Sequence, residues 1–138
     1  MARQTPLLCK TFAADTAIED AGVCVVMSGS KPGNVALPGG ALATKLVGVT
    51  DEPASSGAAG YAVGVQVAGI AQIQTDGSAE IAPGDYVAIA NTSGQIKAVT
   101  PASGTTLRQV VGIALSAATN TAGLLVDVLL QPSIYVGA

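Results

Sequence analysis

The sequence of 138 residues contains no histidine and no tryptophan, and aromatic residues make up only 3% of it. Histidine is the commonest general base and zinc ligand, so the most frequent components of catalytic and metal sites are missing. Without tryptophan there is little to stack on sugars or single-stranded nucleic acids. The nine carboxylates are spread over expected turns and links, and no G-x-S-x-G, G-x-G-x-x-G or C-x-x-C motif occurs. We therefore expect a protein that is not an enzyme, with no catalytic residues, cofactor, metal or small-molecule substrate.

Charged residues are scarce as well, at 11%, and the net charge is −3. A typical soluble domain carries about 25% charged residues, so this surface is unusually neutral and is expected to be covered by other protein subunits. The six basic residues are scattered rather than clustered, which argues against nucleic-acid binding. The longest apolar stretch, Leu124–Leu130, is short and interrupted by Asp127, so no membrane-spanning segment is expected.

The two cysteines, Cys9 and Cys24, lack the spacing of a metal-binding motif. They could pair with each other, but two reduced thiols in a protein made in the cytosol are the favoured interpretation. The sequence alone leaves both states open.

The sequence is rich in Val, Ile, Leu and Ala, and it contains 17 glycines and 7 prolines. β-branched and small residues interrupted by turn formers favour short strands over long helices. The clearest example is Ile81–Val99, where Pro83-Gly84-Asp85 forms a turn and the following residues alternate. The alternation places Val87 and Ile89 on the buried face of one strand and Ile96 on that of the next. We predict a β-hairpin there and an all-β fold.

A similar order of features occurs twice, in pseudo-repeats at about 18–67 and 81–130. Each contains a hairpin, then a V-G-[VI] strand (Val47-Gly48-Val49 and Val111-Gly112-Ile113), then a strand that begins at a glycine. We predict a compact β-barrel or sandwich built from two similar β units. The alternative is that any β chain rich in Ala, Gly and Val aligns with itself.

Three regions are expected: an N-terminal extended arm at 1–20, a single β domain at 21–131 and a C-terminal tail at 132–138. Gln131-Pro132 is expected to end the last strand, because proline cannot donate to a sheet. Met1–Thr11 shows little periodicity and is either a frayed terminus or a strap that lies on a partner. The candidate partner-contact residues are Arg3, Gln4, Thr5, Pro6, Leu7, Leu8, Asp127 and Tyr135.

Asp127 is the one charged residue inside a strongly apolar predicted strand, where it shares a face with Leu125 and Leu129. Either this face is exposed to solvent near the end of the strand, or the carboxylate contacts a Lys or Arg of another subunit. We favour the subunit contact, because buried carboxylates need partners.

Six short segments, taken in order, resemble the head-decoration (capsid cement) proteins of tailed bacteriophages. They are Gly22-Val23-Cys24-Val25-Val26, Leu46-Val47-Gly48-Val49, Ala82-Pro83-Gly84-Asp85-Tyr86-Val87, Ser93-Gly94-Gln95-Ile96, Val111-Gly112-Ile113-Ala114 and Val126-Asp127-Val128-Leu129. The resemblance covers Ala21–Leu130. The chain departs from the family pattern in having Gly22 without an Asp in the first repeat and in its longer arm and tail.

The resemblance implies a compact β protein that forms homo-oligomers, typically trimers, on the outer face of an expanded icosahedral shell. There it would bind the major capsid protein and stabilise the shell against the pressure of packaged DNA. It would be a virion protein made in the host cytoplasm, with its capsid contacts in Met1–Thr11. The alternatives are another phage structural β module, such as a tail or fibre domain, or a surface adhesion module.

Overall fold

The computed structural model describes residues 5–15, 17–52, 62–100 and 106–137, and it describes their side chains except at 5–7, 52, 106–107 and 135–137. Within these ranges the chain contains strands and no helix, which confirms the predicted all-β fold. Among the same residues, no helix is long and apolar enough to span a membrane. The strands are β1 (Thr5–Ala13), β2 (Cys24–Met27), β3 (Val35–Ala36), β4 (Leu46–Glu52), β5 (Ala62–Gln74), β6 (Tyr86–Ile89), β7 (Ile96–Val99), β8 (Thr106–Ala114) and β9 (Leu125–Gly137).

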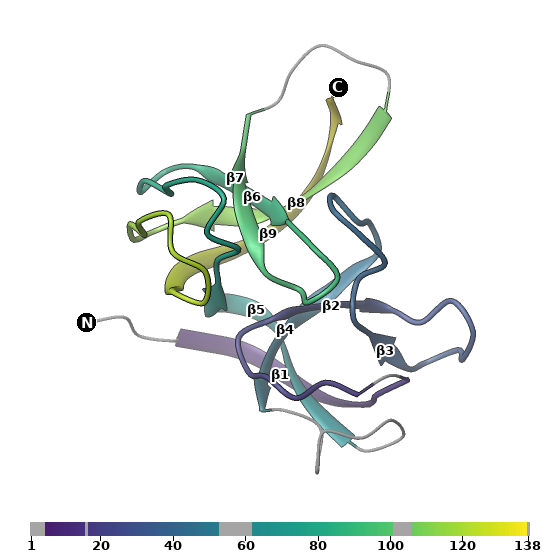
Figure 1. Cartoon of the computed structure of the whole chain (residues 1–138). Helices are drawn as coiled ribbons and strands as arrows, with labels where there is room; N and C mark the ends of the chain where they lie inside the picture. The colour runs from purple at the N-terminus through teal and green to yellow at the C-terminus, as the bar shows by residue number, and fades with distance from the viewer. Residues whose placement is uncertain (1–4, 16, 53–61, 101–105, 138) are drawn as a thin grey trace.

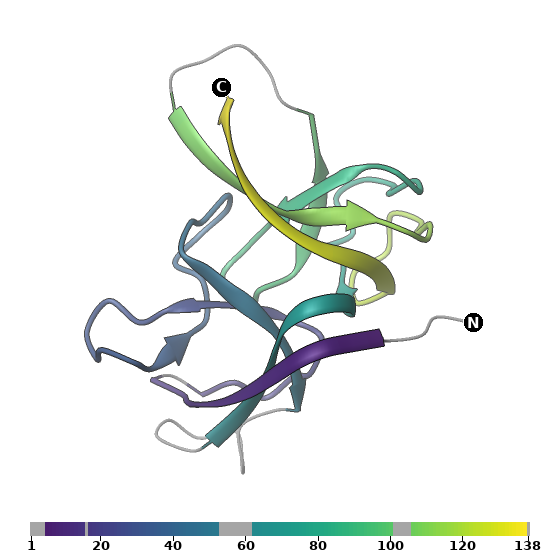
Figure 2. The same ribbon diagram turned by 180° about the vertical axis from the view of Figure 1, so that it is seen from behind.

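The strands form one antiparallel sheet that curls into a half-barrel (Figure 1). Its order is β3-β2-β4-β5-β9-β8-β6-β7, and β1 pairs with β5 off this path. The predicted hairpin is present, since β6 pairs with β7. β5 links the two halves of the molecule: its first part pairs with β1 and β4 and its last part with β9 (Figure 2).

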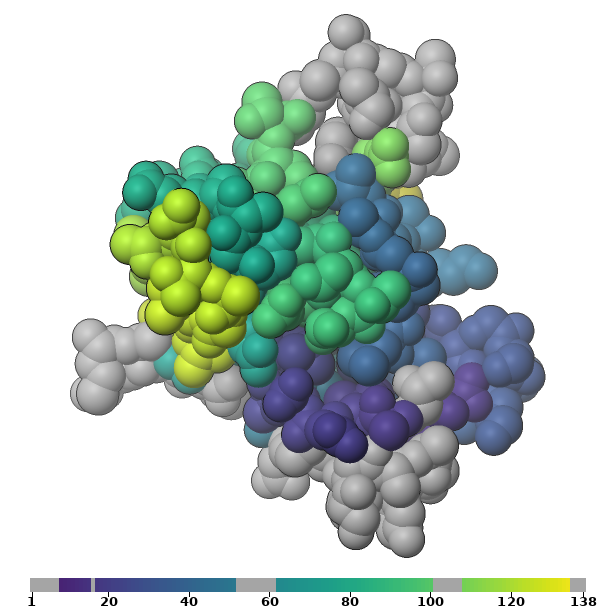
Figure 3. Space-filling model, in the orientation of Figure 1, coloured from purple at the N-terminus to yellow at the C-terminus, as the bar shows by residue number. Residues whose placement is uncertain are grey.

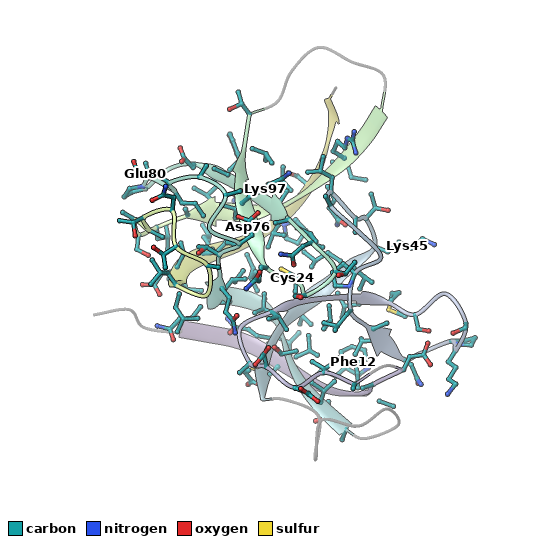
Figure 4. The ribbon with its side chains drawn as sticks, in the orientation of Figure 1. Phe12, Cys24, Lys45, Asp76, Glu80 and Lys97 are labelled. Carbon is teal, nitrogen blue, oxygen red and sulfur yellow. The ribbon has the colours of Figure 1, made fainter. Side chains whose placement is uncertain are left out.

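Two hydrophobic cores fill the curl, one in each half. The first-half core contains Ala14, Ile18, Val23, Val25, Val35, Val63 and Val65. The second-half core is built mainly from β5–β9 but also takes in Cys24, Val26 and Val49 from the first half. Because side chains alternate along a strand, β2 can supply Val25 to one core and Cys24 to the other. Figure 4 shows Cys24 between the two halves, where the cores meet.

The two halves repeat several local contacts. The sheet order reads the same from both ends, with β3-β2-β4-β5 in one half and β7-β6-β8-β9 in the other. Two isolated parallel bridges, Ala14↔Val35 and Thr75↔Ile96, occupy matching places before each hairpin. A Cβ at Gly48 would lie 2.2 Å from the carbonyl oxygen of a neighbouring strand, and one at Gly112 would lie 2.0 Å from such an oxygen. These contacts agree with the aligned pattern in the sequence, while the origin of the two halves from one repeated unit stays a prediction.

A free N-terminal arm is not confirmed for the residues that can be placed. Thr5–Ala13 forms β1, which pairs with β5 from Thr5↔Ile70 to Ala13↔Ala62. The pairing is irregular, with register shifts between Pro6 and Leu8 and between Leu8 and Cys9. Proline has no N–H to donate, so such a break near Pro6 is physically reasonable.

The expectation that Gln131-Pro132 ends the last strand is wrong. β9 continues through Pro132 to Gly137 and pairs with β8 as far as Thr106↔Gly137. The register between these strands shifts between the pairs Val110↔Ser133 and Gly112↔Leu130. Bulges are among the few places where a sheet tolerates proline, so the irregularity accommodates Pro132.

The two cysteines do not pair. Both thiols are free, Cys9 exposed and Cys24 buried. Cys9 is opposite Gln66, Gln66 is opposite Val49, and Val49 is opposite Cys24. Three strand spacings of about 4.8 Å separate the cysteines, more than the roughly 7 Å that limits the Cα–Cα distance of a disulfide.

Candidate interaction surface

Three aspartates of the described residues accept hydrogen bonds that hold turns in place. The Asp15 carboxylate accepts hydrogen bonds from the hydroxyls of Ser28 and Ser30. Asp76 Oδ1 accepts from the N–H and hydroxyl of Ser78, at 3.0 and 2.8 Å. Asp85 Oδ2 accepts from the Ala82 N–H at 2.9 Å, within the turn before β6. In the part of the chain that can be placed, no group of three or more His, Cys, Asp or Glu side chains could hold a metal ion.

The Asp15 cluster also shows how these hydrogen bonds affect ionisation. The hydrogen bond from Ser28, followed by that from Ser30, lowers the pKa of Asp15, and the Lys31 ammonium 3.5 Å away adds to the effect. Donors to a carboxylate favour its charged form. The cluster fixes the turn between β2 and β3 onto the link that follows β1.

The structure places the residues predicted to contact a partner at three separate positions: the start of β1 and two positions on β9. Arg3 and Gln4 lie outside the described residues. Thr5, Pro6, Leu7 and Leu8 begin β1, whose pairing is with β5; among the described strands no other pairs with β1. The Leu8 side chain is 58% exposed. The start of β1 therefore presents a strand edge with an apolar side chain, the kind of edge that can pair with another chain.

Asp127 lies on β9, opposite Gln72 of β5. Its backbone N–H donates to the Ser116 hydroxyl at 2.9 Å, and its carbonyl accepts from the Leu115 N–H at 2.7 Å. Its side chain is half-buried on the same face as Leu125, which is 47% exposed. The predicted contact between this carboxylate and a Lys or Arg of another subunit stays a prediction.

Tyr135 lies on the distal part of β9, opposite Arg108 of β8. At about 3.3 Å per residue, this position is roughly 26 Å along the strand from Asp127. The structure thus brings the start of β1 near Asp127, through the pairs Thr5↔Ile70 and Ile70↔Leu129, but it does not bring Tyr135 into the same patch.

An apolar row that the sequence pattern did not predict crosses the outside of the second half. Tyr86 is opposite Ile113, Ile113 is opposite Leu129, and Leu129 is opposite Ile70. Directly opposed residues share one face of a sheet, and these four side chains, which we call the open ladder, belong to neither core. The alternate residues Val87 and Val128 point into the core, as expected for the other face.

The open ladder is more exposed than an apolar row inside a monomer would be. Tyr86 is 47% exposed, and the other three side chains are half-buried. Leu115 and Leu125, 45% and 47% exposed, lie on the adjoining strand ends. A signal for this surface existed in the sequence, because the last predicted strand is apolar on both faces except at Asp127. Contiguous apolar surface of this kind marks a site of protein–protein contact.

Comparison with known proteins shows the family to which the chain belongs. A search of curated proteins found no match to the chain. The family model described as "Phage cement protein" matches residues 3–130, nearly the whole chain. That family consists of structural proteins of the phage capsid rather than enzymes, and its members are virion components. The chain therefore belongs to the phage cement protein family.

Proposed function

We propose that this protein binds the outer face of a phage capsid as a homotrimer and stabilises the shell through contacts with the major capsid protein. It is made in the host cytoplasm and joins the shell after the shell has expanded. The observation that carries the proposal is the exposed apolar surface of a weakly charged chain that belongs to the cement family. Repeated attachment over a shell supports stabilisation, because many linked weak contacts give high avidity.

The shell contact is assigned to the start of the chain, with Arg3, Gln4, Thr5, Pro6, Leu7 and Leu8 as contact residues and Asp127 and Tyr135 as further contacts. Leu8 supports this assignment, since it is exposed at a strand edge. An edge of this kind offers backbone hydrogen bonds as well as apolar area to a neighbouring protein.

The test is co-sedimentation with shells of the phage that encodes the chain, in expanded and unexpanded forms. The wild-type protein is expected to sediment with expanded shells and to raise the temperature at which they release DNA. Leu8→Glu is expected to weaken binding by about tenfold or more, as for loss of an apolar anchor. Leu124→Glu, a matched change at another exposed leucine, should bind normally.

Two results would contradict the proposal. Equal binding by wild-type and Leu8→Glu protein would remove the start of the chain from the contact. Failure of the wild-type protein to bind any shell, together with binding to tails or fibres, would favour the alternative of a tail or fibre module.

A further inference from the structure

The last part of β9 leaves the body of the sheet together with the first part of β8. Residues 133–137 pair with residues 106–110 without a register shift, and we call these two segments the distal ribbon. On its edge away from β8, β9 pairs with β5, but this pairing ends at Ile70↔Leu129. Among the described strands, none takes the place of β5 beside residues 133–137. Figures 1 and 2 show the ribbon extending away from the rest of the molecule.

The distal ribbon has little to stabilise it within one chain. A pair of strands with no third strand is marginally stable in water. Residues 131–134 are all exposed, and Ile134, at 64%, is the most exposed of the large apolar side chains that the structure describes. An open strand edge with an exposed apolar side chain is a place where another strand can pair.

A second open edge belongs to β1. Residues 9–13 pair with residues 62–66 of β5 without a register shift, and in the described part of the chain no strand pairs with their other edge. We call this other edge the β1 edge. A lysine can protect an edge from pairing, but the Lys10 ammonium lies over the Phe12 ring, 5.3 Å from its centroid. The Lys10 side chain is therefore folded along its own strand, and the β1 edge is open.

The two ends of the sheet are closed within the chain. β3 and β7 are the last strands in the sheet order. Each has a parallel bridge to another segment, Val35 of β3 to Ala14 and Ile96 of β7 to Thr75. The N–H of the residue after Ala14 and that of the residue after Thr75 donate to the bridged strands, at 2.7 and 3.0 Å. The two halves also pack against each other, with green residues of the second half against blue residues of the first (Figure 3).

The chain already uses the end of one long strand to extend the sheet at the start of another. β5 and β9 are each 13 residues long, and residues 70–74 at the end of β5 pair with residues 125–129 at the start of β9. Residues 133–137 are the matching end of β9, and no described strand start lies beside them. The matching start in another copy, residues 62–66 of β5, is already paired with β1. The open edge next to that start is the β1 edge.

We propose that residues 133–137 of one copy pair with the β1 edge of the next copy, which joins the distal ribbon of the first to the sheet of the second. In Figures 1 and 2 β1 lies low in the molecule and the ribbon ends at its top, so a chain does not join its own two edges. The contact uses two different surfaces of each copy, as a closed ring of three requires. This inference rests on the homotrimer in the proposed function and names the surfaces that form it.

This contact leaves the start of β1 available to the shell. Pairing at an edge uses backbone N–H and carbonyl groups, whereas side chains point to the faces of the sheet. The register shifts on either side of Leu8 separate residues 5–8, which are assigned to the shell, from the regular edge at residues 9–13. One strand can therefore serve both contacts.

The first experiment measures the mass of the free protein by light scattering and ultracentrifugation. The wild-type protein is expected to be an oligomer. Ile134→Lys places a charge on the distal ribbon and is expected to weaken association by about tenfold or more. Leu125→Lys, the same change at an exposed leucine at the start of the same strand, should keep the wild-type mass, and so should Leu8→Glu.

Circular dichroism and the Tm establish that each variant is folded. An oligomer that survives Ile134→Lys but is dissociated by Leu125→Lys would overturn the proposal, since the contact would then lie at the other end of β9.

The second experiment uses the natural Cys9, whose exposed thiol lies on β1. One further cysteine is introduced on the distal ribbon, and each variant is mildly oxidised. The five variants are Ser133→Cys, Ile134→Cys, Tyr135→Cys, Val136→Cys and Gly137→Cys. Pairing of the two edges predicts that at least one new cysteine forms a disulfide with Cys9 of another copy. The same variants in Cys9→Ser protein should not link, because the remaining natural thiol, Cys24, is buried.

Two results of this experiment would overturn the proposal. Linkage that persists in Cys9→Ser protein would show that two distal ribbons pair with each other. An oligomer in which none of the five cysteines links to Cys9 would show that the β1 edge is not the partner.

The remaining outcomes separate this inference from the proposed function. An oligomer that survives Ile134→Lys and gives no linkage to Cys9 overturns the inference and leaves shell binding intact. A monomeric wild-type protein that still sediments with shells overturns both the inference and the trimer, but not the capsid role. A folded oligomer that links through Cys9 but binds no shell retains the inference and contradicts the capsid contact.

Discussion

At the residue scale, two glycines allow the strands of each half to approach closely. Gly48 faces Gln66 and Val65 of β5, and Gly112 faces Leu129 of β9, with no room for a methyl group. Both lie in the middle of strands, where glycine has no packing of its own to offer. The lack of a side chain is therefore what the V-G-[VI] segments contribute to the fold.

We expect Gly48→Ala and Gly112→Ala each to lower the free energy of unfolding by about 1–3 kcal/mol, as for overpacked cores. Urea unfolding followed by circular dichroism measures the change. Gly39→Ala is the control, because a Cβ there meets open space and should change stability by no more than about 0.5 kcal/mol. Equal stabilities of the Gly48 and Gly39 variants would contradict the close approach.

A second residue-scale prediction concerns Asp15. Because its folded-state pKa is lowered, chiefly by the Ser28 hydroxyl, the Asp15 interaction stabilises the fold fully above the unfolded-state pKa. This stabilisation is lost as the pH falls through the lowered pKa. We expect Ser28→Ala to raise the Asp15 pKa towards its ordinary value, measured by the carboxyl carbon shift in an NMR titration. An unchanged midpoint would show that Ser28 does not set the ionisation.

The burial and the hydrogen bonds of Gln66 could not be predicted from the sequence pattern. Its side chain is buried in β5, between β1 and β4, where the pattern predicts only its position on a strand. Its amide Nε2 donates to the carbonyls of Ala68 and Ile70, at 3.2 and 2.9 Å. These bonds form beside the irregular start of β1, and such an irregularity arises from the pairing of distant segments rather than from local sequence.

At the element scale, β1 is part of the sheet and its removal should affect stability. Deletion of residues 1–11 would expose the edge of β5 and leave Phe12, which packs against the first-half core, without its strand. We expect the Tm to fall by roughly 5–10 °C and the protein to aggregate through the freed edge. Deletion of residues 1–4 alone, which precede β1, should leave the Tm unchanged in the same calorimetric scan.

Loss of shell binding after the longer deletion would therefore not identify a contact, since the fold itself is expected to weaken. A Tm for the longer deletion equal to that of the wild-type protein would contradict the contribution of β1. This is why the shell experiment uses Leu8→Glu rather than a truncation.

The elements differ in how well they could be predicted. The hairpin of β6 and β7 was predictable because Val87, Ile89 and Ile96 follow the period of a strand and all three are buried. β1 was not, because the register shifts around Leu8 break that period. The end of β9 was misplaced at Pro132 because a bulge, set by pairing with β8, makes proline acceptable there.

At the scale of the whole molecule, the two cores are expected to unfold together. β2 contributes Val25 to one core and Cys24 to the other, and β5 runs through both. Calorimetry at a concentration at which the protein is monomeric should give one transition with equal calorimetric and van't Hoff enthalpies. Two separate transitions would show that the halves are independent domains.

The low charge of the sequence predicts that other proteins cover much of the surface of this molecule. Composition alone does not identify which part of the surface that is. The open ladder joins Tyr86, Ile113, Leu129 and Ile70, which lie on four strands distributed along much of the chain. Their common face follows from the order of the sheet. The family could be recognised from short segments because those segments are local, whereas the surface is not.

The separation of Cys9 from Cys24 has a practical consequence. Burial raises the pKa of the Cys24 thiol to about 12, so it stays protonated and unreactive, while Cys9 is exposed. A solvent-sensitive dye attached through maleimide chemistry would therefore label one position, on the very strand assigned to the shell. The natural chain therefore carries its own attachment point for an optical reporter, and a shift in the dye's emission on mixing with capsids would follow docking in real time.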